Sequence, residues 1–264
     1  MKNFLLTILA VGCAVVLFLG NMHWKEETAV SVEDVESGSA GDSVAESDAP
    51  VEEEADSTGD AEAILKLAKN WPEEARLRLE ERIAEGGPFK MAFVGSNALN
   101  SWAPLSKAAI EEAYGEEVVS VTLQGFEGTT ADYTNENKAA ELAALDADLV
   151  LLEPFTLADN GVIRIEDSLL HISNWMDAVQ AENPDTVFML QPSQPIYQAG
   201  YYLTQLDALE QFANEREIVY LDHWAAWPGT QEDELLGYLT DENLPNEEGA
   251  RVWSEFVNGG FVGE

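Results

Sequence analysis

The chain is poor in three residue types that carry much of protein chemistry. Among its 264 residues it has one cysteine, three histidines and 13 lysines and arginines. The single cysteine, Cys13, lies in an apolar segment, so the rest of the chain has no disulfide and no thiol chemistry. No His-x-x-x-His motif, cysteine pair or Gly-rich phosphate loop is present. We therefore predict neither a metal site nor a cofactor.

The scarcity of basic residues excludes whole classes of partner. The 50 Asp and Glu residues give a formal net charge of −37, and residues 63–264 alone carry 36 acidic and 11 basic side chains. Such a domain repels nucleic acid and anionic lipid, so neither is expected as a partner. A dense carboxylate surface is typical of proteins kept soluble in high salt or at high pH, and a cation-binding role is the alternative.

The N-terminal residues 1–24 predict export. Residues 4–20 contain no charge, a length at the short end of what crosses a bilayer as a helix. We favour an uncleaved single-pass anchor in the cell membrane, with the domain outside. A cleaved signal peptide or a lipid anchor on Cys13 are the alternatives. Residues 25–60 follow as a spacer, because 14 acidic and no basic residues between Glu26 and Glu62 predict a disordered, self-repelling segment.

Residues 61–264 predict one α/β domain. Short apolar runs predict strands at 90–94, 117–123, 148–152, 186–190 and 217–221. Helical patterns lie before the first strand, at 104–114, 135–146, 164–182 and 203–215, and at 246–257. Strands alternating with helices predict a three-layer α/β/α sandwich around a mostly parallel five-stranded sheet.

In such a sheet, ligands bind beyond the carboxyl ends of the strands. Ser96 follows the first predicted strand, and Gly128 lies in the loop after the second. Asn160 lies in the loop after the third, and His223 follows the fifth. Glu153 directly follows the third strand, where it is either a polar site residue or a turn cap.

Ester hydrolysis by a serine needs a nucleophile, a base, a group that orients the base and donors for the oxyanion. Ser96 is the candidate nucleophile. The backbone amides of Ser96 and Gly128 and the side chain of Asn160 are candidate oxyanion donors. Each of these residues also has an ordinary role in turns, and it is their combination in chain order that indicates catalysis.

The stretch LPNEEGARVWSEFV at 244–257 resembles the last conserved block of the SGNH/GDSL hydrolase superfamily. The resemblance spans residues 90–257 and implies the same three-layer fold. It implies Ser96 as nucleophile and Gly128 and Asn160 as oxyanion donors. The sequence departs from the family at Gly95, where an aspartate usually precedes the serine. It departs again at Leu244, where the catalytic histidine is expected.

With the family's histidine missing, we predict that His223 is the base and that Asp222 or Asp241 orients it. The alternative is that His223 only packs among Trp224, Trp227 and Pro228. The predicted function is an exported, membrane-anchored serine esterase that deacylates a cell-surface or extracellular glycan. The alternatives are a catalytically degenerate module that binds a glycan or an envelope partner, with Trp224, Trp227, Tyr201 and Tyr202 stacking on sugar, and a structural surface module.

Overall fold

The computed structural model describes residues 57–263. The predicted anchor, residues 1–24, and nearly all of the predicted spacer, residues 25–60, lie outside these residues. The predicted start of the domain at residue 61 falls inside the first described helix, α2 (Ser57–Leu67). Within the described residues, no helix is both long and apolar enough to cross a membrane.

Five strands form one sheet in the order β2-β1-β3-β4-β5, and every pair is parallel. All five predicted strands are confirmed, and the sheet is wholly rather than mostly parallel. The strands are β1 (Phe89–Gly95), β2 (Val119–Gly125), β3 (Leu149–Leu152), β4 (Val187–Leu190) and β5 (Val219–Tyr220). The apolar runs lack alternation because both faces of the sheet are buried.

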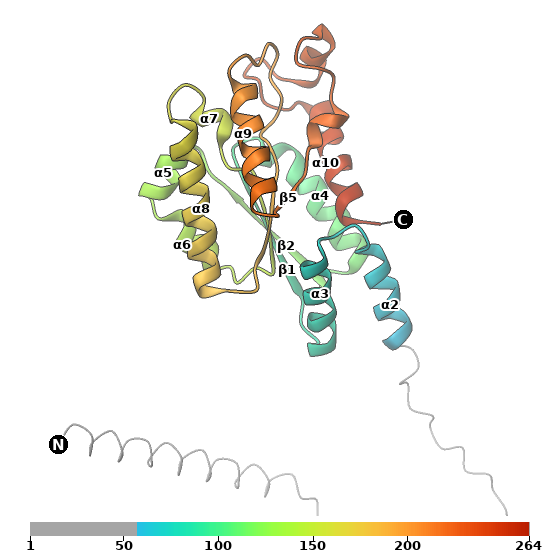
Figure 1. Ribbon diagram of the computed structural model, residues 1–264. Coiled ribbons are helices and arrows are strands. Elements are labelled where there is room, and N and C mark those ends of the chain that lie inside the picture. The colour runs from blue at the N-terminus through green and yellow to red at the C-terminus, as the bar shows by residue number, and fades with distance from the viewer. Residues whose placement is uncertain (1–56, 264) are drawn as a thin grey trace, which may run out of the picture. The chain divides into compact units, whose positions relative to one another are not determined.

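Helices cover the two faces of the sheet in two separate layers (Figure 1). Met91 and Phe93 of β1 pack into one core, and Ala92 and Val94 pack into the other. The first core is covered by α2, α3 (Glu73–Glu85), α4 (Leu99–Tyr114) and α10 (Glu247–Phe261). The second is covered by α5 (Thr130–Asn135), α6 (Lys138–Ala143), α8 (Ile165–Glu182) and α9 (Tyr202–Glu215). The predicted three-layer α/β/α sandwich is confirmed.

Three predicted helices have different bounds in the structure, and the last of them, predicted at 246–257, extends to Phe261 as α10. The helix predicted to begin near Pro104 begins at Leu99, and Pro104 lies inside it. The ring leaves the Asn100 carbonyl without its usual helical donor, and Asn100 is exposed to solvent. The helix predicted at 135–146 is shorter and corresponds to α6. It starts only after Asn137, whose φ of 56° is left-handed and separates it from the preceding helix α5.

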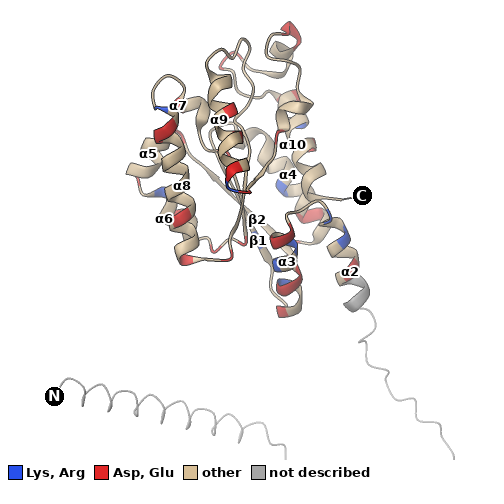
Figure 2. Ribbon diagram, in the orientation of Figure 1, with Lys and Arg blue, Asp and Glu red and all other residues tan. Residues whose placement is uncertain are grey.

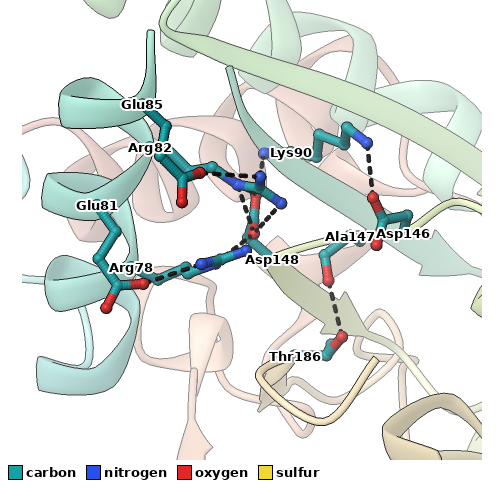
Figure 3. Close-up of polar contacts among 9 residues, drawn as sticks. All are labelled: Arg78, Glu81, Arg82, Glu85, Lys90, Asp146, Ala147, Asp148 and Thr186. Carbon is teal, nitrogen blue, oxygen red and sulfur yellow. Dashed lines mark hydrogen bonds and ion pairs between the residues drawn. The ribbon is translucent and has the colours of Figure 1, made fainter. Parts of the chain in front are cut away.

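A buried ion cluster holds the amino end of the sheet. Asp148, at the start of β3, is 4% exposed and accepts hydrogen bonds from Arg78 Nε at 2.9 Å and Arg82 Nε at 3.0 Å. The Lys90 amide donates to its other oxygen at 2.8 Å. Figure 3 shows both arginines reaching from α3 toward this one carboxylate. The cluster joins α3 to β1 and β3, at the end of the sheet away from the predicted site.

The two ends of the described chain are joined. Gly263 N donates to Leu67 O at 2.7 Å, and Trp71 Nε1 donates to Phe261 O at 2.7 Å. Trp71 also packs against Phe261, with ring centroids 5.9 Å apart. The segment between α2 and α3 is therefore part of the same core as the end of α10.

Figure 2 shows acidic positions on the helices of both layers, and the Asp and Glu side chains of α3, α8, α9 and α10 are exposed to solvent or partly so. Most of the few arginines and lysines are paired with neighbouring carboxylates, as Arg251 of α10 is with Glu248 and Glu255. The excess negative charge therefore faces solvent, in agreement with a surface adapted for solubility.

Candidate active site

Ser96 lies at the carboxyl end of β1, between the strand and α4. It is half-buried, and its hydroxyl oxygen accepts a hydrogen bond from the Ala98 amide at 3.4 Å. The neighbouring strand β3 ends at the same edge and is followed by Glu153. The connection after β1 runs over one face of the sheet and the connection after β3 over the other. This is the kind of crevice in which open α/β sheets bind ligands.

Glu153 is fully buried, and it lies against Ser96. The Ser96 amide donates to Glu153 Oε2 at 2.6 Å, and the Ser193 hydroxyl donates to Oε1. Burial raises the pKa of the Glu153 carboxyl, and hydrogen bonds from Ser193 and Ser96 partly oppose this rise. The prediction that the Ser96 amide is an oxyanion donor is therefore corrected, because that N–H is already bonded to the carboxyl group.

The loops after β2 and β3 are fastened together. The Thr130 amide and hydroxyl donate to the two oxygens of Asp159, at 2.9 Å and 2.8 Å. Because the hydroxyl donates to Asp159, it accepts from His171 Nδ1, 3.0 Å away on α8. Gly128 lies two residues before Thr130, and Asn160 directly follows Asp159, so the two loops that carry the predicted oxyanion donors are held together.

Both of these predicted donors keep their hydrogens free. Within residues 57–263, neither the Gly128 amide nor the Asn160 side chain makes a hydrogen bond. Gly128 has a φ of 153°, and a Cβ there would come within 2.8 Å of the Phe126 ring. Only glycine fits this position without strain. The oxyanion role of Gly128 and Asn160 remains a prediction that this geometry permits.

His223 does not have the contacts of a catalytic base. It is fully buried and begins η1 (His223–Ala226). Its Nε2 lies 2.9 Å from Pro192 O, and its Nδ1 accepts from Trp227 Nε1 at 3.1 Å. The proton is therefore on Nε2, and both ring nitrogens are occupied. The ring also stacks on Trp253, with centroids 3.9 Å apart.

Burial lowers the pKa of His223 to about 3, although the hydrogen bond to Pro192 opposes this change. Such an imidazole stays neutral near pH 7 and has no free lone pair to take a proton from Ser96. The predicted role of His223 as base is thus corrected. The structure instead shows the packing alternative, with Trp253 in addition to Trp227 as neighbours.

The two acids proposed to orient His223 do not contact its ring. Asp222 is exposed and accepts from the Trp224 amide at 3.2 Å, which caps η1. Asp241 is exposed, and its side chain makes no hydrogen bond or ion pair with any described residue. Leu244, in the position expected for histidine, packs against the core. No orienting acid is therefore needed or present at His223.

Comparison with solved structures identifies the fold of the described domain. No protein-family model and no curated protein sequence matches the chain. A carbohydrate esterase of family 3 from Talaromyces cellulolyticus superposes with a TM-score of 0.54 at 19% identity, over 64% of this chain and 94% of that one. For a GDSL-like lipase from Bacteroides thetaiotaomicron, the TM-score is 0.51 at 14% identity, over 72% and 98% of the two chains. The chain has the SGNH/GDSL hydrolase fold.

A third match is a catalytic mutant of an acetylxylan esterase from Geobacillus stearothermophilus, with a TM-score of 0.50 at 12% identity, over 68% of this chain and 96% of that one. Each match thus covers nearly the whole of the other protein, so the SGNH-like domain here contains the complete fold.

The structure explains the residue types at the start of the stretch 244–257, which resembles the last block of the SGNH/GDSL superfamily. Asn246 Oδ1 accepts from the amides of Glu248 and Gly249, at 3.0 Å and 3.1 Å, and so caps α10. A side chain at Gly249 would collide with the Tyr238 carbonyl oxygen. The Pro-Asn-x-x-Gly pattern therefore starts a helix that packs closely on η2 (Asp233–Tyr238).

The aromatic residues considered for sugar stacking are mostly unavailable in the SGNH-like domain. Tyr202 is fully buried and Trp227 is 7% exposed. Trp224 is half-buried and packs on Tyr202 with ring centroids 5.8 Å apart. Tyr201 is 60% exposed. A flat aromatic platform of four rings is therefore not present.

Two features of the site were hard to find from sequence. The sequence places Glu153 at a strand end, but its contact with Ser96 depends on β1 and β3 being neighbours in the sheet. Ser193 lies in the loop after β4. Its sequence context, Gln-Pro-Ser-Gln-Pro, is typical of an ordinary turn and does not indicate that the hydroxyl contacts Glu153. A surface hollow of about 460 Å³ lies elsewhere, near Gln180 and Phe188, and no predicted site residue borders it.

Proposed function

We propose that this domain is a serine ester hydrolase with Ser96 as its nucleophile. The observation that carries the proposal is the place of Ser96 at the switch point of the sheet. Its backbone amide is bonded to the buried Glu153 carboxyl group. Two donors that make no hydrogen bond with any described residue, the Gly128 amide and the Asn160 side chain, lie on the loops after β2 and β3. The SGNH/GDSL fold and the esterases that share it support the same reaction class.

In this reaction Ser96 Oγ attacks the acyl carbon of the ester and a tetrahedral intermediate forms. The Gly128 amide and the Asn160 side chain stabilise the negative charge on the carbonyl oxygen. Collapse of the intermediate releases the alcohol and leaves an acyl group on Ser96, which water then removes. The bond between Thr130 and Asp159 keeps the two donor loops in place before the ester binds.

The test is hydrolysis of p-nitrophenyl acetate by the purified full-length chain and by Ser96→Ala. We expect turnover by the wild type and loss of at least about 100-fold in the variant. An ethoxy-fluorophosphonate probe should add to the peptide that contains Ser96, detected by mass spectrometry. Equal rates for the two proteins, together with no label at Ser96, would contradict the proposal and favour the binding-module alternative.

For the substrate, we propose an acylated glycan outside the cell, with acetate as the acyl group. The export signal read from residues 1–24 and the carbohydrate esterases that share the fold support this choice. Release of acetate from acetylated xylan and from acetylated peptidoglycan, measured against p-nitrophenyl acetate, tests it. A higher kcat/KM for the small aryl ester than for every glycan tried would count against a glycan substrate.

We also propose that the chain is held at the outer face of the cell membrane by residues 4–20. The charge-free length of this segment supports the proposal, and so does the acidic spacer that follows it.

A further inference from the structure

Glu153 is buried without a positive partner. It is 0% exposed, and among the described residues no lysine, arginine or histidine forms an ion pair with it. Carboxyl groups are rarely fully buried unless they are paired. Glu153 is instead bonded to two serines, Ser96 and Ser193, that follow strands on either side of β3.

The residue before Ser96 is glycine because the Glu153 carboxyl group occupies the space that a side chain would need. A Cβ on Gly95 would lie 2.7 Å from Glu153 Oε2 and 3.3 Å from Glu153 Cβ. Gly125, its partner in the register of β2, has no such restriction, since the nearest atom to a Cβ there is 3.8 Å away. The backbone at Gly95 and the carboxyl group are thus fitted to each other.

We propose that Glu153 is the catalytic base that accepts the proton of Ser96 Oγ. This inference rests on the proposed ester hydrolase function. The two histidines of the described domain are excluded as the base because their rings are bonded to other residues. Both nitrogens of His223 are occupied, and His171 on α8 is bonded to Thr130. Glu153 is the ionisable side chain that the structure places in contact with Ser96.

The electrostatic surroundings suit this role. Burial raises the pKa of Glu153, and the hydroxyls of Ser193 and Ser96 interact with the carboxyl group in the opposite sense. A carboxylate with a raised pKa is a stronger base near neutral pH than an exposed one. Its titratable neighbour is Tyr202 of α9, whose pKa burial raises, so the phenol stays neutral. No charged group of the described chain therefore competes for the proton.

The proton and electron balance closes without another reactant. As Ser96 Oγ forms its bond to the acyl carbon, its proton passes to Glu153, and the carbonyl π electrons move to the oxygen. When the C–O bond of the ester breaks, the leaving alkoxide takes this proton. Water then attacks the acyl-serine, gives a proton to Glu153, and Ser96 recovers it on release of the acid. Glu153 ends as the carboxylate with which it began.

The experiment compares Glu153→Gln with wild type and with the matched surface variant Glu182→Gln. Rates of p-nitrophenyl acetate hydrolysis are measured across pH, with circular dichroism to verify folding. We expect wild-type kcat/KM to fall as the pH drops through the pKa of Glu153. Glu153→Gln should lose at least about 100-fold and lose this acidic limb as well, whereas Glu182→Gln should match wild type.

Ser193→Ala distinguishes a base from a merely structural carboxyl group. It removes a hydrogen bond that stabilises the carboxylate, so the acidic limb should move to higher pH in a protein that still folds. Gly95→Ala should displace the carboxyl group and lower kcat/KM by at least about tenfold, while Gly125→Ala should leave it unchanged.

Three results would overturn the inference. One is a rate for Glu153→Gln within about threefold of wild type while Ser96→Ala is inactive, which leaves the hydrolase standing without this base. Another is an unmoved acidic limb in folded Ser193→Ala, which decides the matter even if Glu153→Gln fails to fold. The third is no turnover and no fluorophosphonate labelling of wild type, which removes the hydrolase proposal and its base together.

Discussion

Replacing Asp148 with alanine should destabilise the domain far more than the same change at Asp146. The two aspartates are neighbours at the amino end of β3, and both face basic side chains (Figure 3). Asp148 is 4% exposed and accepts from two arginines and a backbone amide. Asp146 pairs with Lys90 at 2.9 Å, but about half of its surface is in water.

The size of the effect follows from burial. Removing one partner of a buried ion pair costs about 3–5 kcal/mol. Arg78 and Arg82 keep about a fifth of their surface in water and also pair with Glu81 and Glu85, so the lower end applies. We expect Asp148→Ala to lose about 3 kcal/mol, or about 6–12 °C in Tm for a domain of this size. Asp146→Ala should lose less than about 0.5 kcal/mol.

Thermal and urea unfolding followed by circular dichroism measure both variants. Ester hydrolysis at moderate temperature should be retained by each, because the cluster lies at the end of the sheet opposite Ser96. High salt should screen the Asp146 pair and leave most of the loss at Asp148 in place. Equal losses for the two variants, or a loss below about 1 kcal/mol at Asp148, would refute the reasoning from burial.

Two further predictions concern His223 and the N-terminal segment. His223→Gln should be destabilised at pH 7, because Trp227 loses its acceptor and Trp253 its stacking partner. As the pH falls below 6.5, His223 becomes protonated in the unfolded wild type. In the folded protein the same side chain stays neutral until about pH 3. The contribution of His223 to wild-type stability should therefore drop by about 1.4 kcal/mol for each pH unit below 6.5. The advantage of the wild type over the variant, in which the other groups cancel, should shrink by about 2 kcal/mol between pH 7 and pH 5 in urea unfolding, and a constant advantage would contradict this. The full-length chain should sediment with membranes and be open to added protease on intact cells, while a chain without residues 1–24 should not sediment; recovery of the full-length chain in the soluble fraction would argue against an anchor.

Most of the fold could be predicted from sequence because local patterns determine it. The five apolar runs are short and each is bounded by turn residues. Such a run predicts a strand that is buried on both faces. Helix ends were less accurate. Pro104 indicates a helix start on local grounds, but the helix extends back to Leu99, whose side chain is buried in the core. Packing thus outweighed the local preference.

The site could be predicted only in part, because its contacts are long-range. Ser96, Gly128 and Asn160 were found from their places in strand-end loops. The partner of Ser96 was not, since Glu153 reaches it only when β3 lies beside β1. The strand-end position of His223 makes it the candidate base in the sequence, which does not show that Trp227, Trp253 and Pro192 contact its ring.

The junction between Leu67 and Gly263 has a consequence for how the protein presents its site. Gly263 is bonded to the last residue of α2, and Figure 1 shows this helix beginning at the end of the sheet from which β1 starts. Ser96 lies at the opposite end of that strand. A substrate that reaches the crevice beside Ser96 therefore approaches the end of the sheet opposite to α2. A large polymeric ester could occupy this end without contacting the first described helix.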